Sequence, residues 1–243
     1  MLSPECSLLL IRHGQSEWNA VKRWQGIADS PLTELGRRQA EAIGRSIASH
    51  ADGQFSIVAS SDLSRASETA EIIAAELGLA EVLRDERLRE ADAGPWQGMT
   101  PLEIAVAWPG FLEAHRRPAG FETAESVVAR ATSACVDILR RLIEGRSPRG
   151  KPAEVRPRSA IAITHSGLIR SLRRHHGDAD EPVRNLGGIW VHLEFNRLRM
   201  GRVFAIGGPA VSGVDGPGED PGEESERSDE SGDHGRAERG RTG

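Results

Sequence analysis

A run of four apolar residues, Leu8 to Ile11, leads directly into the polar sequence Arg12-His13-Gly14. An unbroken apolar run of this length beside a glycine is typical of a parallel strand that is buried on both faces. Polar groups at the carboxyl end of such a strand lie where open α/β sheets place their ligands. The Arg12 guanidinium is a fork of donors that suits phosphate oxygens, and the His13 imidazole is a candidate nucleophile. Gly14 would let the backbone approach an anion, because no Cβ stands in the way.

The same order of strand, polar junction and helix occurs at two further places in the chain. One apolar strand ends at Ser60, and the helix after it carries Arg65; another ends at Thr164 and is followed by His165-Ser166-Gly167. Because the carboxyl ends of parallel strands meet at one edge of a sheet, we expect all three junctions to lie together. The second strand and helix are predicted at 56–60 and up to 77, and the third at 160–164 and up to about 174.

This edge of the predicted sheet gathers many hydrogen-bond donors. Two arginines, two histidines, Asn19 and two helix N-termini converge there, and helix N-termini favour negative charge. So many donors indicate a site for an anionic ligand, and phosphate is the anion that suits them best. Glu90 precedes the Gly- and Trp-containing segment Gly94 to Gly98, which could carry it into the same cleft as a proton donor.

The alternation of strands and helices predicts the α/β class. We expect a three-layer α/β/α sandwich with a mostly parallel central sheet. A long, weakly regular segment at 85–122 is typical of a lid or binding region inside a compact domain. The other predicted elements are helices at 34–50, 102–107 and 126–142, a short strand at 81–83, a surface loop at 145–158, and two antiparallel strands at 187–195 and 199–205 around an Asn196-Arg197 turn.

Composition divides the chain into a folded domain at 1–207 and a tail at 208–243. The tail is rich in Gly, Pro, Ser, Glu and Asp and carries ten acidic and four basic residues. So few apolar residues cannot offset the entropy of ordering, and we expect disorder there. The whole chain has a net charge of −5, so the domain carries −5 − (−6) = +1. A domain this close to neutral does not suggest a nucleic-acid surface.

Several further classes are disfavoured by what the chain contains. No apolar run reaches the roughly 18 residues of a membrane helix, and the first apolar run is too short for a signal peptide. We therefore expect a cytoplasmic protein that does not bind membranes. Cys6 and Cys135 are far apart in the sequence and are interpreted as reduced, buried thiols. No carboxylate cluster suggests a metal site, and no cofactor is expected.

Five motifs, in order, carry a resemblance to the histidine phosphatase superfamily, the phosphoglycerate-mutase-like proteins. The resemblance covers about residues 7–205 and implies the fold of that family. One departure is the sequence Phe121-Glu122-Thr123, where relatives commonly have Gly-Glu-Ser, which leaves the lining of the substrate side open. The motifs are Arg12 to Asn19, Pro31 to Arg37, Ser60 to Ala66, Leu88 to Glu90 with Gly94 to Gly98, and Thr164 to Gly167.

The resemblance implies a role for each matching residue. His13 would be the nucleophile and become a phosphohistidine, while Arg12, Arg65 and a protonated His165 would hold the phosphoryl oxygens. Glu90 would be the general acid and base, with a pKa raised by a wall formed by Trp96. Trp18 and Trp24 are read equally well as core residues or as substrate walls. The candidates for binding the phosphate or the rest of the substrate are Arg12, Ser16, Asn19, Gln25, Gly26, Arg65, His165 and Ser166.

A metal-independent phosphomonoesterase acting on a small phosphorylated metabolite is the favoured activity. The mutases of the family resemble the same core but have a longer insertion after the glutamate motif and a basic closing segment at the C-terminus. Phosphoglycerate mutase-type transfer and a catalytically weak phospho-ligand or protein-binding member remain the alternatives. Gln15-Ser16 and Trp96-Gln97-Gly98 resemble the glucosyl-3-phosphoglycerate phosphatases, although α-ribazole phosphatase-like relatives share these residues. A homodimer through the sheet edge at 187–205 is a further open hypothesis.

Overall fold

A six-stranded sheet forms the centre of the molecule in the computed structural model, which describes residues 6–50, 54–144, 159–194 and 197–205. The strand order is β3-β2-β4-β1-β5-β6. The first four strands along the chain are parallel, and β5 pairs antiparallel with both β1 and β6, which confirms the mostly parallel sheet. The strands are β1 (Ser7–Arg12), β2 (Phe55–Ser60), β3 (Val82–Arg84), β4 (Ser159–Thr164), β5 (Gly187–Glu194) and β6 (Arg197–Ala205).

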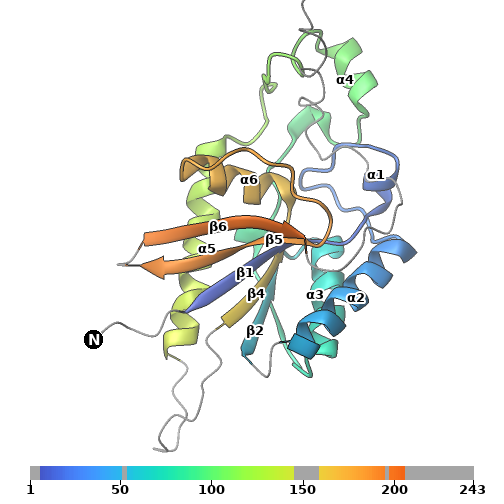
Figure 1. The fold of residues 1–243 in the computed structure, drawn as a ribbon. Coiled ribbons are helices and arrows are strands. Elements are labelled where there is room, and N and C mark those ends of the chain that lie inside the picture. Colours follow the sequence, from blue (N-terminus) through green and yellow to red (C-terminus); the bar gives the residue numbers. More distant parts are fainter. Residues whose placement is uncertain (1–5, 51–53, 145–158, 195–196, 206–243) are drawn as a thin grey trace, which may run out of the picture.

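Helices cover both faces of the sheet, as Figure 1 shows. Leu8 and Leu10 of β1 pack in one core cluster with α5 (Ala124–Glu144) and α6 (Ser166–His175). Leu9 and Ile11 pack in a second cluster with α2 (Glu34–His50) and α3 (Ser64–Glu76). Successive side chains of a strand point to opposite faces, so the continuous apolar run of β1 serves both layers. The predicted three-layer sandwich is confirmed.

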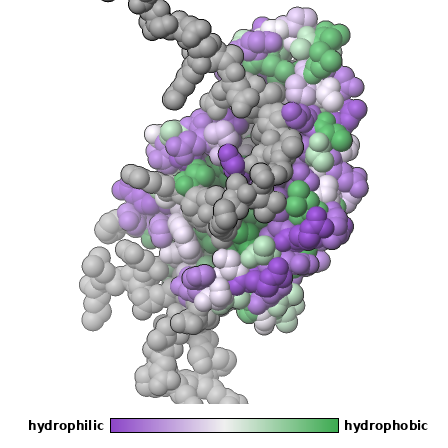
Figure 2. Space-filling model, turned by 45° about the vertical axis from the view of Figure 1, so that its right-hand side comes forward, coloured by the Kyte–Doolittle hydropathy of each residue, from purple (hydrophilic) through white to green (hydrophobic). Residues whose placement is uncertain are grey.

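The long segment between β3 and α5 forms a third cluster together with Trp24 from the loop after α1. Trp24, Trp96, Ile104 and Leu112 are buried in this cluster. The face seen in Figure 2 is largely hydrophilic, with hydrophobic residues gathered at its upper end, where α4 (Pro101–Ala107) lies. The short elements here are α1 (Glu17–Ala20), η1 (Glu86–Leu88) and η2 (Gly94–Trp96), and α1 is a single turn too short to leave a periodic pattern.

A few predicted boundaries differ from the structure. Arg197 begins β6 and pairs with Glu194, so it belongs to the strand rather than to the predicted turn. Helix α5 is longer than predicted at both ends, and β3 begins one residue later. The predicted loop at 145–158, the turn residue Asn196, and the tail with its boundary at 207 lie outside the described residues.

Two further expectations concern the cysteines and membrane-spanning helices. Cys6 and Cys135 are buried and neither forms a disulfide, as expected. Within the described part of the chain, no helix is both long enough and apolar enough to cross a membrane.

Candidate active site

The register of the central strands brings the two histidines together. Arg12 pairs with Thr164 across β1 and β4, so His13 and His165 follow at the same level of the sheet edge. The His13 amide donates to the Thr164 carbonyl over 3.0 Å. The imidazole rings meet edge to face with their centroids 5.1 Å apart. The expected convergence of these two junctions is confirmed.

The His13 ring is fixed by its own backbone. Its Nδ1 lies 2.7 Å from the Gly14 carbonyl oxygen, which can only accept, so Nδ1 carries the proton. In that tautomer Nε2 holds the lone pair that a nucleophile needs. A Cβ on Gly14 would lie 2.6 Å from the Gly36 carbonyl oxygen. Glycine is therefore required here by the close approach of α2, a reason other than the expected approach of an anion.

Two buried arginines flank His13, and backbone carbonyls hold both. Arg12 Nη1 donates to the Val183 carbonyl over 2.9 Å. Arg65 donates through its two terminal nitrogens to the carbonyls of Ala28 and Gly26, at 2.9 and 2.7 Å. Within the described residues, the buried Arg12 Nε has no hydrogen-bond partner. Buried donors are normally satisfied, so this atom suits an anionic ligand.

His165 is fully buried, and neither of its ring nitrogens has a hydrogen-bond partner within the described chain. Burial, followed by the nearby positive charges of Arg65 and Arg12, lowers the pKa of His165 well below the ordinary value. This direction favours the uncharged imidazole, and the expectation of a protonated His165 stays a prediction for the complex with phosphate. A phosphate at this position would favour the charged form and supply partners for the ring.

Glu90 reaches the same edge from the segment between η1 and η2. Its side chain is buried, and its two carboxyl oxygens accept the backbone N–H groups of Ala91 and Gly167, both over 2.9 Å. Gly167 lies in the first turn of α6, so the carboxyl group sits at a helix N-terminus. Trp96 does not line the cavity beside Glu90, whereas Trp24 does, so the expected aromatic wall comes from Trp24.

A cavity of about 430 Å³ opens beside the carboxyl group of Glu90. Trp24 and Phe121 provide an aromatic wall, and Arg117 lies over both rings at 5.3 Å from their centroids. The predicted binding residues Gly26 and Ser166 line the cavity. The leaving group of a phosphate ester would have room here, on the side of Glu90.

Three other predicted binding residues serve the local structure. Ser16 caps α1, where its hydroxyl accepts the Asn19 amide N–H over 3.3 Å and donates to Gln25 Oε1 over 2.9 Å. Asn19 Oδ1 accepts from the Ser16 amide over 3.2 Å. None of the three lines the cavity in the described structure, and neither do Arg12, His13, Arg65 and His165, so the phosphate-binding role of the three stays a prediction. They shape the loop that follows His13.

Sequence reasoning missed the segment before β5. Asn185 Nδ2 donates to the His13 carbonyl over 2.9 Å, and Val183 supplies the carbonyl that holds Arg12. Strand β5 is antiparallel to β1, so its first residues lie beside the last residues of β1. An amide immediately before an antiparallel neighbour strand was thus the signal that could have found Asn185. The described residues include no group of three His, Cys, Asp or Glu side chains that could hold a metal ion.

Comparison with known proteins places the chain in a family. The sequence profile of the histidine phosphatase superfamily (branch 1) matches residues 8–186. The chain belongs to this superfamily, and the phosphatase class expected from the motifs is confirmed at that level.

Individual relatives carry two kinds of name. Glucosyl-3-phosphoglycerate phosphatase of Mycolicibacterium vanbaalenii is 37% identical over 68% of this chain and 71% of that protein. A 2,3-bisphosphoglycerate-dependent phosphoglycerate mutase of Methylocella silvestris is 37% identical over 68% of this chain and 78% of that protein. The structure of a mycobacterial glucosyl-3-phosphoglycerate phosphatase with VO3 matches with a TM-score of 0.65 and 30% identity, over 82% of this chain and 97% of that one.

Proposed function

We propose that this protein hydrolyses the phosphomonoester of a small phosphorylated metabolite through a phosphohistidine at His13. The observation that carries the proposal is the buried set of Arg12, His13, Arg65 and His165 at one sheet edge. Two fixed guanidinium groups and an uncharged imidazole leave this edge positively charged and ready for a phosphate. Phosphoryl transfer needs chiefly alignment and charge stabilisation, and these residues can supply both.

In the first step His13 Nε2 attacks phosphorus, so an N–P bond forms while the ester P–O bond breaks. Glu90, on the cavity side, gives its proton to the leaving oxygen. The protonated carboxyl group then becomes a carboxylate, which its bonds from the Ala91 and Gly167 amides stabilise. Proton transfer of this kind contributes about 10²–10⁴-fold to the rate.

In the second step water attacks the phosphohistidine from the side that the leaving group has vacated. Glu90 takes a proton from that water, the N–P bond breaks, and orthophosphate leaves with His13 restored. Two arginines supply the positive charge that a metal ion would otherwise provide, so we propose that the reaction is metal-independent. Activity unchanged by EDTA is the expected outcome, and loss of activity on chelation with recovery on adding a divalent ion would contradict it.

A phosphoglycerate mutase is the second candidate, and it is favoured by the mutase name of a relative that is 37% identical. Both activities use the same phosphohistidine, and they differ in whether water or a second hydroxyl group accepts the phosphate. A mutase must keep water away from this intermediate. Phosphate release from 3-phosphoglycerate, measured beside isomerisation of the same compound, separates the two.

The test is a hydrolysis screen of phosphomonoesters with wild type and His13→Ala side by side. Glucosyl-3-phosphoglycerate belongs in the screen because relatives are named as its phosphatases. We expect at least one metabolite to be hydrolysed, with a loss of about 10³-fold or more in His13→Ala. Equal, negligible turnover by both proteins would favour a binding protein, and fast isomerisation with little phosphate release would favour a mutase.

A further inference from the structure

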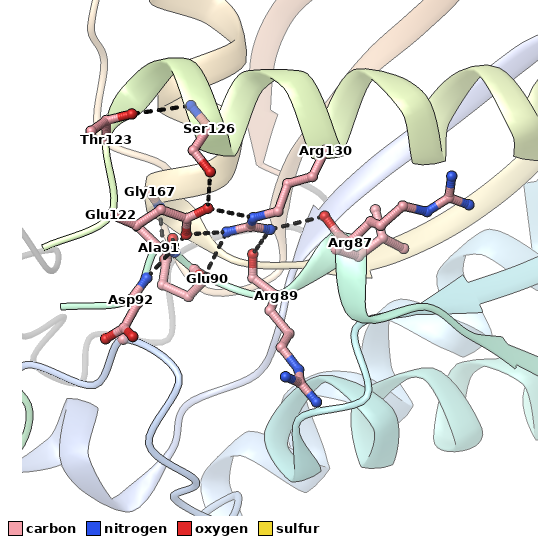
Figure 3. Close-up of polar contacts among 12 residues, drawn as sticks. Arg87, Arg89, Glu90, Ala91, Asp92, Glu122, Thr123, Ser126, Arg130 and Gly167 are labelled. Carbon is pink, nitrogen blue, oxygen red and sulfur yellow. Dashed lines mark hydrogen bonds and ion pairs between the residues drawn. The ribbon is translucent and has the colours of Figure 1, made fainter. Parts of the chain in front are cut away.

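The segment that carries Glu90 lacks regular structure, yet its backbone is bound by one side chain of α5. Residues 89–93 lie between η1 and η2 and belong to no helix or strand. Their carbonyls therefore need partners from elsewhere. Arg130 Nη1 donates to the carbonyls of Arg87 and Arg89 over 2.9 and 2.6 Å, and Nη2 donates to the Glu90 carbonyl over 2.9 Å (Figure 3).

The other bonds of Arg130 go to Glu122. Arg130 Nε donates to Glu122 Oε1 over 2.9 Å, and Nη2 donates to Oε2 over 2.8 Å. A guanidinium has five N–H donors, so three carbonyl bonds and two carboxylate bonds use every one. Lysine has three donors and cannot reproduce this fork. The position accordingly requires arginine for reasons of geometry as well as charge.

Glu122 also binds the far side of the same segment. Its Oε2 accepts the Asp92 amide over 3.2 Å, and its own amide donates to the Asp92 carbonyl over 2.8 Å. Ser126, in the first turn of α5, donates its hydroxyl to Glu122 Oε1 over 2.8 Å. Burial raises the pKa of Glu122, but the bonds from Arg130 and Ser126 outweigh it, so the pKa is lowered and the carboxylate stays ionised. The backbone is thus held on both sides of Glu90.

We propose that Arg130, oriented by Glu122, is a positioning residue for Glu90, and this proposal rests on the proposed function. Arg130 does not line the cavity, and its hydrogen bonds go to Glu122 and to the backbone that carries the acid, so we expect its main effect on the reaction to come through that backbone. The Glu90 side chain reaches the α6 N-terminus, and the Arg130 bonds fix where its main chain starts. A displacement of about 1 Å at a catalytic group can cost about 10²-fold in rate.

The experiment compares two substrates that differ in their need for an acid. An alkyl ester such as glycerol phosphate must have its leaving oxygen protonated, whereas dinitrophenyl phosphate releases a stable phenolate. Because kcat/KM reports the steps up to departure of the leaving group, the ratio of kcat/KM for the two esters measures acid catalysis. We expect Glu90→Gln to lower kcat/KM for the alkyl ester by about 10²–10⁴-fold and to change the aryl ester far less.

Arg130→Gln should show the same selective loss at a smaller size, about 10- to 100-fold on the alkyl ester. The kcat/KM of Arg130→Lys for the alkyl ester should lie between those of this variant and wild type. The control is Arg84→Gln, which breaks the ion pair and hydrogen bond of Arg84 with Glu71 and Ser67 away from the cavity and should leave the ratio unchanged. If Arg130 served stability alone, its loss would lower the apparent kcat/KM equally for both esters, because less of the protein would be folded.

The outcomes separate this proposal from the one on which it rests. If Glu90→Gln lowers kcat/KM equally for both esters, the acid role in the proposed function fails. If Glu90→Gln is selective while Arg130→Gln is not, the positioning role is overturned. Should Arg130→Gln fail to fold, Glu122→Gln decides, because it keeps the side-chain shape while removing the charge that orients Arg130. Selective loss in Glu122→Gln supports the proposal, and an unchanged ratio overturns it.

Discussion

At the scale of single residues, His165 connects the site to the pH dependence of stability. Its pKa is lowered in the folded protein by burial and by Arg65. As the pH falls below the ordinary histidine value of about 6.5, the unfolded chain binds a proton that the folded protein does not bind. This group therefore makes the protein less stable as the pH falls through that value.

We expect His165→Asn to reduce this loss. Between about pH 7.5 and about pH 5.5, the free energy of unfolding of wild type should fall more steeply than that of the variant. Urea denaturation at the two pH values measures the difference. Equal slopes for the two proteins would show that His165 titrates normally in the folded protein.

Gly167 donates its backbone N–H to the Glu90 carboxyl group and lies against it. A Cβ at this position would lie 2.6 Å from Glu90 Oε1, so one of the two groups would have to shift. Gly167→Ala should therefore displace the carboxyl group and lower kcat/KM for an alkyl ester by about 10-fold or more, because acid catalysis depends on placement. In the Glu90→Gln background the same change should cost little further. Independent, additive losses would show that Gly167 acts on something other than Glu90.

At the scale of elements, α2 packs against the loop after β1 at two glycines. A Cβ on Gly36 would lie 2.1 Å from the Gln15 carbonyl oxygen, and one on Gly14 would lie 2.6 Å from the Gly36 carbonyl oxygen. The helix and the loop that carries His13 can approach this closely only because both side chains are absent. The packing of α2 against this loop thus sets the position of His13.

Gly36→Ala is expected to destabilise the protein by about 1–3 kcal/mol, because the helix must move away from the loop. The sign is diagnostic, since glycine to alanine inside a helix otherwise stabilises by about 0.5–1 kcal/mol. Chemical denaturation of the two proteins measures the change. A stabilised variant would contradict the account of this contact.

Most elements could be predicted from the sequence because their patterns are local. The apolar runs of β1, β2 and β4 and the helical spacing of α2, α3 and α5 are each visible within one stretch. The single turn α1 could not be predicted, because its support is the hydroxyl of Ser16 and a bond to Gln25 rather than a periodic pattern. Strand β6 begins two residues before the predicted start, because its first residues are held in the strand by pairing with β5.

At the scale of the whole molecule, the site is assembled from segments that are distant in sequence. His13, Arg65, Glu90 and His165 could be predicted because each follows a recognisable strand or motif. The residues that hold these side chains in place were harder to predict. Asn185 and Val183 act through a side-chain amide and a backbone carbonyl, and neither is visible as a motif. The protonation of His165 depends on charges that only the folded arrangement brings together.

The fold divides the tasks of the proposed reaction between the rigid sheet edge and the irregular segment above it. Strands β1 and β4 and helix α3 carry the proposed phosphate-binding residues, and the two strands are hydrogen-bonded to each other in the core. The acid comes from a segment that Arg130 and Glu122 must hold in place. We infer that the position of His13 is set by the fold itself, while the position of Glu90 depends on side-chain contacts.

The central claim, a phosphohistidine at His13, is tested most directly by trapping it in Glu90→Gln with dinitrophenyl phosphate. That ester needs no acid, whereas hydrolysis of the intermediate lacks its base, so the phosphoenzyme should accumulate. Rapid quenching in alkali followed by peptide mass spectrometry should find phosphate on His13, stable in base and labile in acid. His13→Ala should show none. Release of dinitrophenolate without phosphate on His13, or phosphate on another residue, would contradict the account.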